Sequence, residues 1–369
     1  MIDKAAFLNE LEEVVNIDSG TYYKKGVDAV GEWFADRYAS MGWDIEWYEP
    51  DGELGKSFTA YNADHDDIDV LVMCHLDTVF PEGEVAKRPF SIEGDFCYGP
   101  GVADMKSGCV FLLHVLRELH AEQGLKKKYA VFFNGEEEIG SLHTRPIIEE
   151  LSRKSKFAFA VEPARANGAF LNQRKGSSRY FIEFHGKAAH SGNNPEEGIC
   201  AVTEAANWIL FFKSMVDNEK GVYLNPGVVK GGTSVNSIPD FAEMKVDVRF
   251  IRQEDGEEVH DKIMKKLKTG FDEKVKIDLK GGITRPPMMP NDKTEEICEK
   301  IDELGRQNGV EVKWVFAGGG SDASFPSAFG VPSLCGMGLP GGKSHSAEEF
   351  LDLRQFEERF KLLKDILLM

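Results

Sequence analysis

Apolar positions in the first half of the chain alternate between helical spacing and short uninterrupted runs. Apolar residues spaced three and four apart predict helices at 7–15, 27–41, 107–121 and 141–154. Uninterrupted apolar runs, typical of strands buried on both faces of a sheet, occur at 69–74, 129–133 and 157–161. Because strands and helices alternate, this half is predicted to form an α/β domain with a mostly parallel sheet.

The pattern changes in the middle of the chain. Residues 179–186 alternate strictly between apolar and polar side chains, which predicts a strand with one exposed face. A helix, two strands, a helix and a strand are predicted to follow, at 195–218, 221–230, 241–252, 254–268 and 274–280. This β-α-β-β-α-β order indicates a small α+β domain of ferredoxin-like type with an open antiparallel sheet.

The first pattern returns from Thr294, with a helix to residue 307, strands at 312–316 and 331–335, and a final helix at 348–368. We therefore expect an α/β domain built from residues 1–176 and 288–369. The α+β domain, residues 177–287, interrupts it. A length of 369 residues agrees with two domains.

The net charge, the apolar runs and the cysteine spacing argue against several classes of function and location. The net charge of −18 disfavours binding to nucleic acid or to an anionic membrane. No apolar run approaches 18 residues, and the N-terminus lacks the basic and apolar segments of a signal peptide, so we expect neither a membrane span nor secretion. The six cysteines are widely spaced without a C-x-x-C pair, which predicts reduced thiols in a cytoplasmic protein.

Acidic and imidazole side chains stand just beyond the predicted strands of the α/β domain. His75 and Asp77 follow the run at 69–74, Glu136, Glu137 and Glu138 follow 129–133, and Glu162 follows 157–161. Asp104 precedes a predicted helix, and His345 lies in a Gly-rich loop. Taken singly, each residue is also compatible with an ordinary structural role, such as a helix cap or a solvated loop.

Their joint placement is more informative than any one of them. Parallel strands bring their carboxyl ends to one edge of a sheet, so these side chains are expected to meet there. Carboxylates and imidazoles without a thiolate suit two divalent cations about 3.5–4 Å apart, zinc or else manganese or cobalt.

Three ordered motifs resemble those of the M20 zinc metallopeptidases. They are MCHLDTV at 73–79, GPGVADMKSG at 99–108 and NGEEEIGS at 134–141. Two further segments, HLDTVFPEG at 75–83 and RPFSIEGD at 88–95, look most like the glutamate carboxypeptidase branch. The resemblance covers essentially the whole chain, and it implies a zinc-exopeptidase-like catalytic domain with a lid and dimerisation domain at 177–287.

The resemblance implies a role for each residue near the sheet edge. His75 and Glu162 would hold one metal, Glu138 and His345 the other, and Asp104 would bridge both. Asp77 would orient the side of the metal site that contains His75. Glu137 would be the general base that takes a proton from a metal-bridging water. When the family motif is aligned on Gly140 and Ser141, Glu136 occupies the position of its first acidic residue. The resemblance also suggests a cis peptide bond between Asp104 and Met105.

Substrate contacts are implied for the inserted domain and for one loop. His190, in KAAHSG at 187–192, would act on the site of the other subunit of a homodimer. Asn236 would contact substrate, and Arg285 would bind its carboxylate. Gly320 belongs to GGGSDA at 318–323, which resembles the family's substrate loop. A phosphate loop is disfavoured there because no lysine follows at the P-loop spacing.

The leading hypothesis is a dinuclear metal-dependent hydrolase of carboxypeptidase type, which cleaves a peptide or amide bond next to a residue with a free carboxylate. An N-acyl amino acid deacylase with the same site is the alternative. A catalytically silent metal-binding dimerisation protein is the third, but the implied ligands and base are all present. We expect small peptides or N-acyl amino acids as substrates and a homodimer, because an open antiparallel sheet has edges that must be covered.

Overall fold

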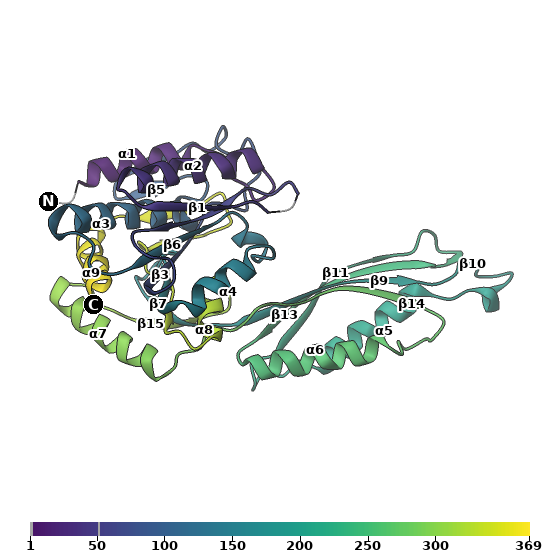
Figure 1. Cartoon of the computed structure of the whole chain (residues 1–369). Coiled ribbons are helices and arrows are strands. Elements are labelled where there is room, and N and C mark those ends of the chain that lie inside the picture. Colours follow the sequence, from purple (N-terminus) through teal and green to yellow (C-terminus); the bar gives the residue numbers. More distant parts are fainter. Residues whose placement is uncertain (1–2, 51) are drawn as a thin grey trace. The chain divides into compact units, whose positions relative to one another are not determined.

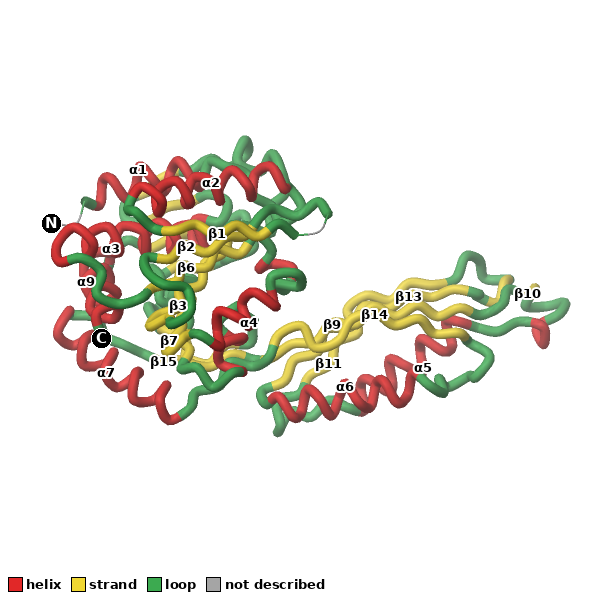
Figure 2. The backbone as a smooth tube through the Cα atoms, viewed as in Figure 1, coloured by secondary structure: helices red, strands yellow, loops and turns green. Residues whose placement is uncertain are grey.

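The computed structural model describes residues 3–50 and 52–369. The chain divides into two compact units (Figures 1 and 2). The first unit contains Met1–Gln173, Met288–Ala317 and Ser321–Met369, and the second contains Arg174–Pro287 with Gly318–Gly320. The second unit thus begins three residues before the range expected for the insertion and includes part of the Gly-rich loop.

A six-stranded sheet lies at the centre of the first unit. Its order is β1 (Asp44–Tyr48), β2 (Ser57–Tyr61), β6 (Tyr129–Asn134), β3 (Ile68–His75), β7 (Ser155–Ala160) and β16 (Ser333–Leu334). The last four strands are parallel, whereas β1 and β2 pair antiparallel at one edge. The mostly parallel sheet predicted from the apolar runs is confirmed.

Helices cover both faces of this sheet, as β3 illustrates. Val70 and Val72 belong to the core formed with α1 (Lys4–Val15), α2 (Lys24–Ser40), α3 (Ser107–Gln123) and α9 (Phe356–Leu368). Leu71 and Met73 point the other way, into the core formed with α4 (Arg145–Arg153) and α8 (Ser324–Ala328). Burial on both faces explains the uninterrupted apolar sequence of the strand.

Smaller elements complete the first unit. Helix α7 (Asp292–Asn308) packs against α9. Strand β15 (Trp314–Ala317) pairs with β8 (Phe170–Arg174). A second sheet has the order β17 (Gly341–Gly342), β18 (Phe350–Asp352), β5 (Phe96–Tyr98) and β4 (Ser91–Glu93). No helix among the described residues is long and apolar enough to cross a membrane.

The second unit has the predicted β-α-β-β-α-β order. Its antiparallel sheet runs β11 (Tyr223–Gly231), β13 (Phe241–Phe250), β9 (Gly176–His185) and β14 (Lys276–Arg285). Tyr180, Ile182 and Phe184 of β9 pack in one core with residues of α5 (Ala201–Ser214) and α6 (Gln253–Leu267). The short strands β10 (Ala189–His190) and β12 (Ser237–Ile238) pair beside this sheet.

The last helix is shorter than predicted. It begins at Phe356 rather than at 348, and β18 occupies part of the intervening segment. The buried side chain of Glu349 accepts hydrogen bonds from the backbone N–H groups of Gly101, Ala103 and Asp104. These contacts hold residues around 349 against the loop that carries Asp104, so the segment does not continue the helix.

Candidate metal centre

Strand β3 ends at His75, whose imidazole is buried between two carboxyl-bearing residues. Nδ1 lies 2.9 Å from the backbone carbonyl oxygen of Asp77, and Nε2 lies 3.1 Å from Oδ1 of Asp104. A neutral imidazole carries only one N–H, so it cannot donate to both oxygens. The ring is therefore positively charged, or a cation takes the place of the proton at Nε2.

Asp104 lies in a short turn, Val102–Lys106, just before α3. Its peptide bond to Met105 is cis, which confirms the prediction made from the family resemblance. One carboxylate oxygen, Oδ1, faces His75, and the other, Oδ2, lies 3.3 Å from Nε2 of His345. The same His345 nitrogen lies 3.2 Å from Oε2 of Glu138.

Two groups of potential ligand atoms therefore share Asp104. One group contains His75, Asp104 and Glu162, and the other contains Asp104, Glu138 and His345. Within each group the ligand atoms lie within 4.8 Å of one another. The structure thus brings together all five residues that the sequence analysis nominated as metal ligands.

The charges in this cluster favour a cation. Burial opposes a charge on His75, but hydrogen bonds to Asp104 and Asp77 raise the pKa of His75 well above its usual value. Hydrogen bonds to Asp104 and Glu138 raise the pKa of His345 to about 10. Burial raises the pKa of Glu138, and the nearby carboxylates of Asp104 and Asp77 contribute to the shift. The negative charge of the carboxylates thus stabilises the protonated imidazoles. The same charge would stabilise a bound metal ion.

One buried atom supports the same fit. Among the described residues, Oε1 of Glu138 is buried without a hydrogen-bond partner. A buried carboxylate oxygen without a partner is costly, and coordination to a cation is one way to satisfy it. Together with the mixture of carboxylates and imidazoles, this makes the residues present suitable for divalent cations.

Asp77 organises the turn that carries Glu137 and Glu138. Its Oδ1 accepts the backbone N–H of Glu137 at 3.0 Å, and its Oδ2 accepts that of Glu138 at 3.2 Å. Oδ2 also accepts the Thr21 hydroxyl at 2.7 Å. Glu136 is directed elsewhere and accepts the backbone N–H groups of His143 and Thr144.

Three supporting residues were not predicted from the sequence. Thr21 anchors Asp77, as described above, and Glu349 holds the loop of Asp104. Asp322, at the end of the Gly-rich loop, accepts hydrogen bonds from the side chains of Asn134 and Ser141 at 2.6 and 2.5 Å. Asp322 lies within the motif GGGSDA, but no local signal marks Thr21 or Glu349, because their partners lie far away in sequence.

The remaining predicted residues belong to the second unit, where they form two pairs. His190 and Asn236 lie together because the N–H of Ser191 donates to the backbone carbonyl of Asn236 at 3.0 Å. Nδ1 of His190 accepts the backbone N–H groups of Gly192 and Asn193, each at 3.1 Å. The neutral ring therefore carries its hydrogen on Nε2, which leaves a hydrogen-bond donor for another molecule.

Arg285 and Gly320 form the second pair. A Cβ atom at Gly320 would lie 2.8 Å from Cδ of Arg285, so the arginine packs where only glycine leaves room. Arg174, which the sequence analysis did not single out, donates to the carbonyl oxygens of Gly319 and Gly320 at 3.1 and 3.0 Å. It holds this part of the loop in place.

The profile of Peptidase family M20/M25/M40 matches residues 71–369. The chain belongs to this family. Carboxypeptidase G2 of Pseudomonas sp. (strain RS-16) is 31% identical over 370 residues, which cover 97% of this chain and 87% of that protein. Acetylornithine deacetylase of Proteus mirabilis is 29% identical over 195 residues, covering 48% of this chain and 49% of the relative.

The M20 fold is also found among solved structures. An M20 family metallo-carboxypeptidase from Sulfolobus solfataricus superposes with a TM-score of 0.79 at 17% identity, covering 99% of this chain and 98% of that one. The M20 family generally binds divalent metals, and this member is accordingly a metallopeptidase or amidohydrolase.

Proposed function

We propose that this M20 protein is a dinuclear metal-dependent hydrolase of carboxypeptidase type, which cleaves a peptide or amide bond next to a residue with a free carboxylate. One observation carries the proposal. The two carboxylate oxygens of Asp104 face two different histidines, His75 and His345, and so join two groups of potential ligands. His75 and Glu162 would hold one zinc ion, and Glu138 and His345 the other, with cobalt or manganese as alternatives.

Divalent cations held by these residues would polarise the scissile carbonyl and lower the pKa of the attacking water. Glu137 is the general base: its carboxylate accepts a proton from the attacking water and returns it to the leaving nitrogen. Asp77 keeps Glu137 and Glu138 in position, because it accepts the backbone N–H of each. His190 donates its Nε2 hydrogen to the oxygen that becomes negative during the attack.

Substrate recognition is assigned to three further residues. Arg285 binds the free carboxylate of the substrate by charge-assisted hydrogen bonds. Gly320 leaves room for the arginine, and Asn236 contacts the substrate beside His190. We propose small peptides and N-acyl amino acids as substrates.

The second unit supports a homodimer in which His190 serves the site of the partner subunit. Arg285 pairs with Ser177 at one end of β9, whereas His190 follows His185 at the other end. At about 3.3 Å per residue, these ends are roughly 25 Å apart. One small substrate cannot contact both residues of a single chain at that separation.

Exposed apolar side chains on the same unit favour such an association. Val202 and Leu210 of α5 are exposed, and so are Val228 and Val229 of β11, which packs beside α5. We also propose a cytoplasmic location. All six cysteines are free, and five of them are buried, as expected of a protein in a reducing compartment.

Deacylation of N-acyl amino acids is the second candidate function. The similarity to acetylornithine deacetylase over 195 residues favours it. The ligands and the base would be the same, and only the group on the acyl side of the scissile bond would differ.

A substrate panel tests the proposed function. Dipeptides, N-acyl-glutamates and N-acetyl amino acids are incubated with protein loaded with zinc, cobalt or manganese, and each substrate is paired with its carboxyl-amidated form. We expect hydrolysis of free-carboxylate substrates only, with activity lost on chelation and restored by metal. Equal hydrolysis of the amidated forms, or full activity after exhaustive chelation, would refute the proposal.

A further inference from the structure

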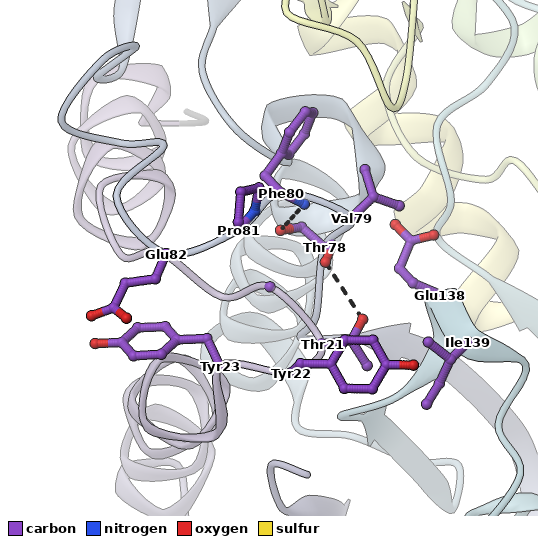
Figure 3. Close-up of a pocket in the computed structure, with 11 residues that line it drawn as sticks. Thr21, Tyr22, Tyr23, Thr78, Val79, Phe80, Pro81, Glu82, Glu138 and Ile139 are labelled. Carbon is purple, nitrogen blue, oxygen red and sulfur yellow. Dashed lines mark hydrogen bonds between the residues drawn. The ribbon is translucent and has the colours of Figure 1, made fainter. Parts of the chain in front are cut away.

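The proposed base and one proposed metal ligand lie on the same short turn. Glu137 and Glu138 belong to residues 135–140, here called the acidic turn, which follow β6. Packing holds this turn only in part, because Glu138 and Ile139 line a cavity of about 440 Å³ (Figure 3). A Cβ atom at Gly140 would meet none of the described residues within 4 Å, apart from its neighbours in the chain. The position of both carboxylates therefore depends on hydrogen bonds that hold the turn.

The middle and the ends of the acidic turn are held separately. Asp77 holds the middle, since it accepts the backbone N–H groups of Glu137 and Glu138. The chain enters the turn at Asn134 and leaves it at Ser141. Ser141 has a left-handed backbone conformation, with a φ of 57°. Residues with a side chain rarely adopt this conformation, so surrounding contacts must stabilise it.

Asp322 binds both ends of the acidic turn with one carboxylate. Oδ2 accepts a side-chain N–H of Asn134 at 2.6 Å, and Oδ1 accepts the hydroxyl of Ser141 at 2.5 Å. Nδ2 of Asn134 also donates to Oγ of Ser141 at 2.9 Å, so the three side chains form a closed ring of hydrogen bonds. Each is at most 3% exposed, and a hydrogen bond is stronger where water is excluded.

The core of the first unit keeps Asp322 itself in place. Its backbone carbonyl oxygen accepts the N–H of Phe325 at 3.0 Å, near the start of α8. Ala323 and Phe325 are buried in the core formed with α4. Asp322 can therefore serve as a fixed anchor for the more loosely packed turn.

We propose that Asp322 is a positioning residue for the general base. It fixes both ends of the acidic turn and so keeps the carboxylate of Glu137 within reach of the attacking water. The proposal rests on the proposed function for the role of Glu137. Asp322 acts through Asn134 and Ser141 rather than on the substrate. Its effect on the rate can still be large, because a displacement of about 1 Å in a reacting group can cost about 100-fold.

Two substitutions that break the same contact test the proposal. An amide at residue 322 can accept only one of the two donors, and Ser141→Ala removes one donor. At saturating zinc, we expect Asp322→Asn and Ser141→Ala each to lower kcat about tenfold with KM little changed, and the double variant to lose no more. Asn62→Ala is the control. Asn62 accepts the N–H of Tyr129 at the other end of β6, so its loss should lower stability but not kcat.

An exchange of the two facing side chains separates positioning from a general loss of stability. Asn134→Asp places one carboxylate against another and should lower kcat further than Asp322→Asn does. Addition of Asp322→Asn to this variant restores a donor that faces an acceptor. We expect the exchanged pair to be at least about tenfold more active than Asn134→Asp alone. If Asn134→Asp does not fold, the comparison of Asp322→Asn, Ser141→Ala and Asn62→Ala still decides.

Zinc titration adds a measurement that does not depend on turnover. Because Glu138 lies on the acidic turn, zinc affinity should fall in Asn134→Asp and recover in the exchanged pair. This pattern in a protein that hydrolyses no substrate would support the anchoring by Asp322 and contradict the proposed function. Hydrolysis with equal losses of kcat in Asp322→Asn and Asn62→Ala, or with additive losses in Asp322→Asn and Ser141→Ala, would overturn the role of Asp322 alone.

Discussion

Asp77 connects several parts of the candidate centre through one carboxylate. It receives hydrogen bonds from Thr21 and from the backbone N–H groups of Glu137 and Glu138, and it lies 3.5 Å from Nδ1 of His75. A small displacement of Asp77 would therefore move a ligand and the proposed base together.

The Glu136–Glu138 run allows a test of the role of each acid. Glu137→Gln should keep both metal ions and lower kcat by at least about 100-fold, because an amide cannot accept the proton of water. Glu138→Gln should instead lose occupancy of one metal site. Elemental analysis and steady-state kinetics of both variants distinguish the two effects. Loss of a metal ion from Glu137→Gln would mean that the assignment is wrong by one residue.

Glu349 is predicted to support the centre without binding metal. Glu349→Ala leaves three N–H groups of the Asp104 loop without an acceptor, and two of them are buried, so we expect the free energy of unfolding to fall by about 1–3 kcal/mol. Metal affinity should fall as well, because Asp104 is no longer held. Denaturant unfolding of the metal-free protein and metal titration provide the two measurements. Glu348→Ala, at the exposed neighbouring residue, is the control. Equal losses of stability and metal affinity in Glu348→Ala and Glu349→Ala would contradict this role.

The sequence identified ligands more readily than their supports. His75, Asp104 and Glu138 stand in motifs with a fixed local spacing, so they could be named before the structure. Thr21 and Glu349 act through partners 56 and more than 240 residues away. Such pairs leave no local pattern in a single sequence.

In the central sheet of the first unit, the uninterrupted apolar strands were predicted, whereas β1 and β2, which mix polar and apolar residues, were missed. Strand β2 is buried at all five positions, but its sequence, SFTAY, contains three residues with hydroxyl groups, Ser57, Thr59 and Tyr61. Ser57 accepts the backbone N–H of Gly135, and Thr59 donates to the hydroxyl of Tyr48. Hydrogen bonding lets these polar side chains be buried, and it hides the strand from an analysis of apolar runs.

A charge cluster among α1, α2 and α3 predicts a pH-dependent stability. Burial works against a charge on Glu10, but hydrogen bonds from His114, Arg117 and Arg37 lower its pKa to about 2. A lowered pKa in the folded state stabilises the protein above about pH 4.5, and this contribution is lost as the pH falls toward 2.

Substitution of Glu10 should reveal this contribution. We expect Glu10→Gln to lower the free energy of unfolding by about 1–2 kcal/mol at pH 7, and the difference should vanish near pH 2. Urea unfolding across this pH range measures it. Glu12→Gln, at an exposed position of the same helix, should have no effect. A constant difference at all pH values would exclude the charge as its cause.

At the scale of the whole molecule, the change in patterning near residue 177 predicted an inserted domain, and the second unit begins at Arg174. The sequence alone could not show that Arg285 and His190 lie near opposite ends of β9. That required the register, in which Arg285 pairs with Ser177.

Mixing two inactive variants tests whether His190 acts in the partner's site. His190→Ala and Glu137→Gln homodimers should each be nearly inactive. After the two are unfolded and refolded together, half of the dimers are mixed, and each mixed dimer has one site with both residues intact. Activity should therefore recover to roughly a quarter of the wild-type value. No recovery would place His190 in its own subunit's site, and a fully active monomer in sedimentation would exclude the dimer.

Anomalous diffraction from crystals of the zinc-loaded protein tests the central claim most directly. We predict two zinc peaks in each subunit, one beside His75 and Glu162 and the other beside Glu138 and His345. Each peak should lie against a different carboxylate oxygen of Asp104. A single peak at full zinc occupancy, or two peaks that do not share Asp104, would contradict a dinuclear centre.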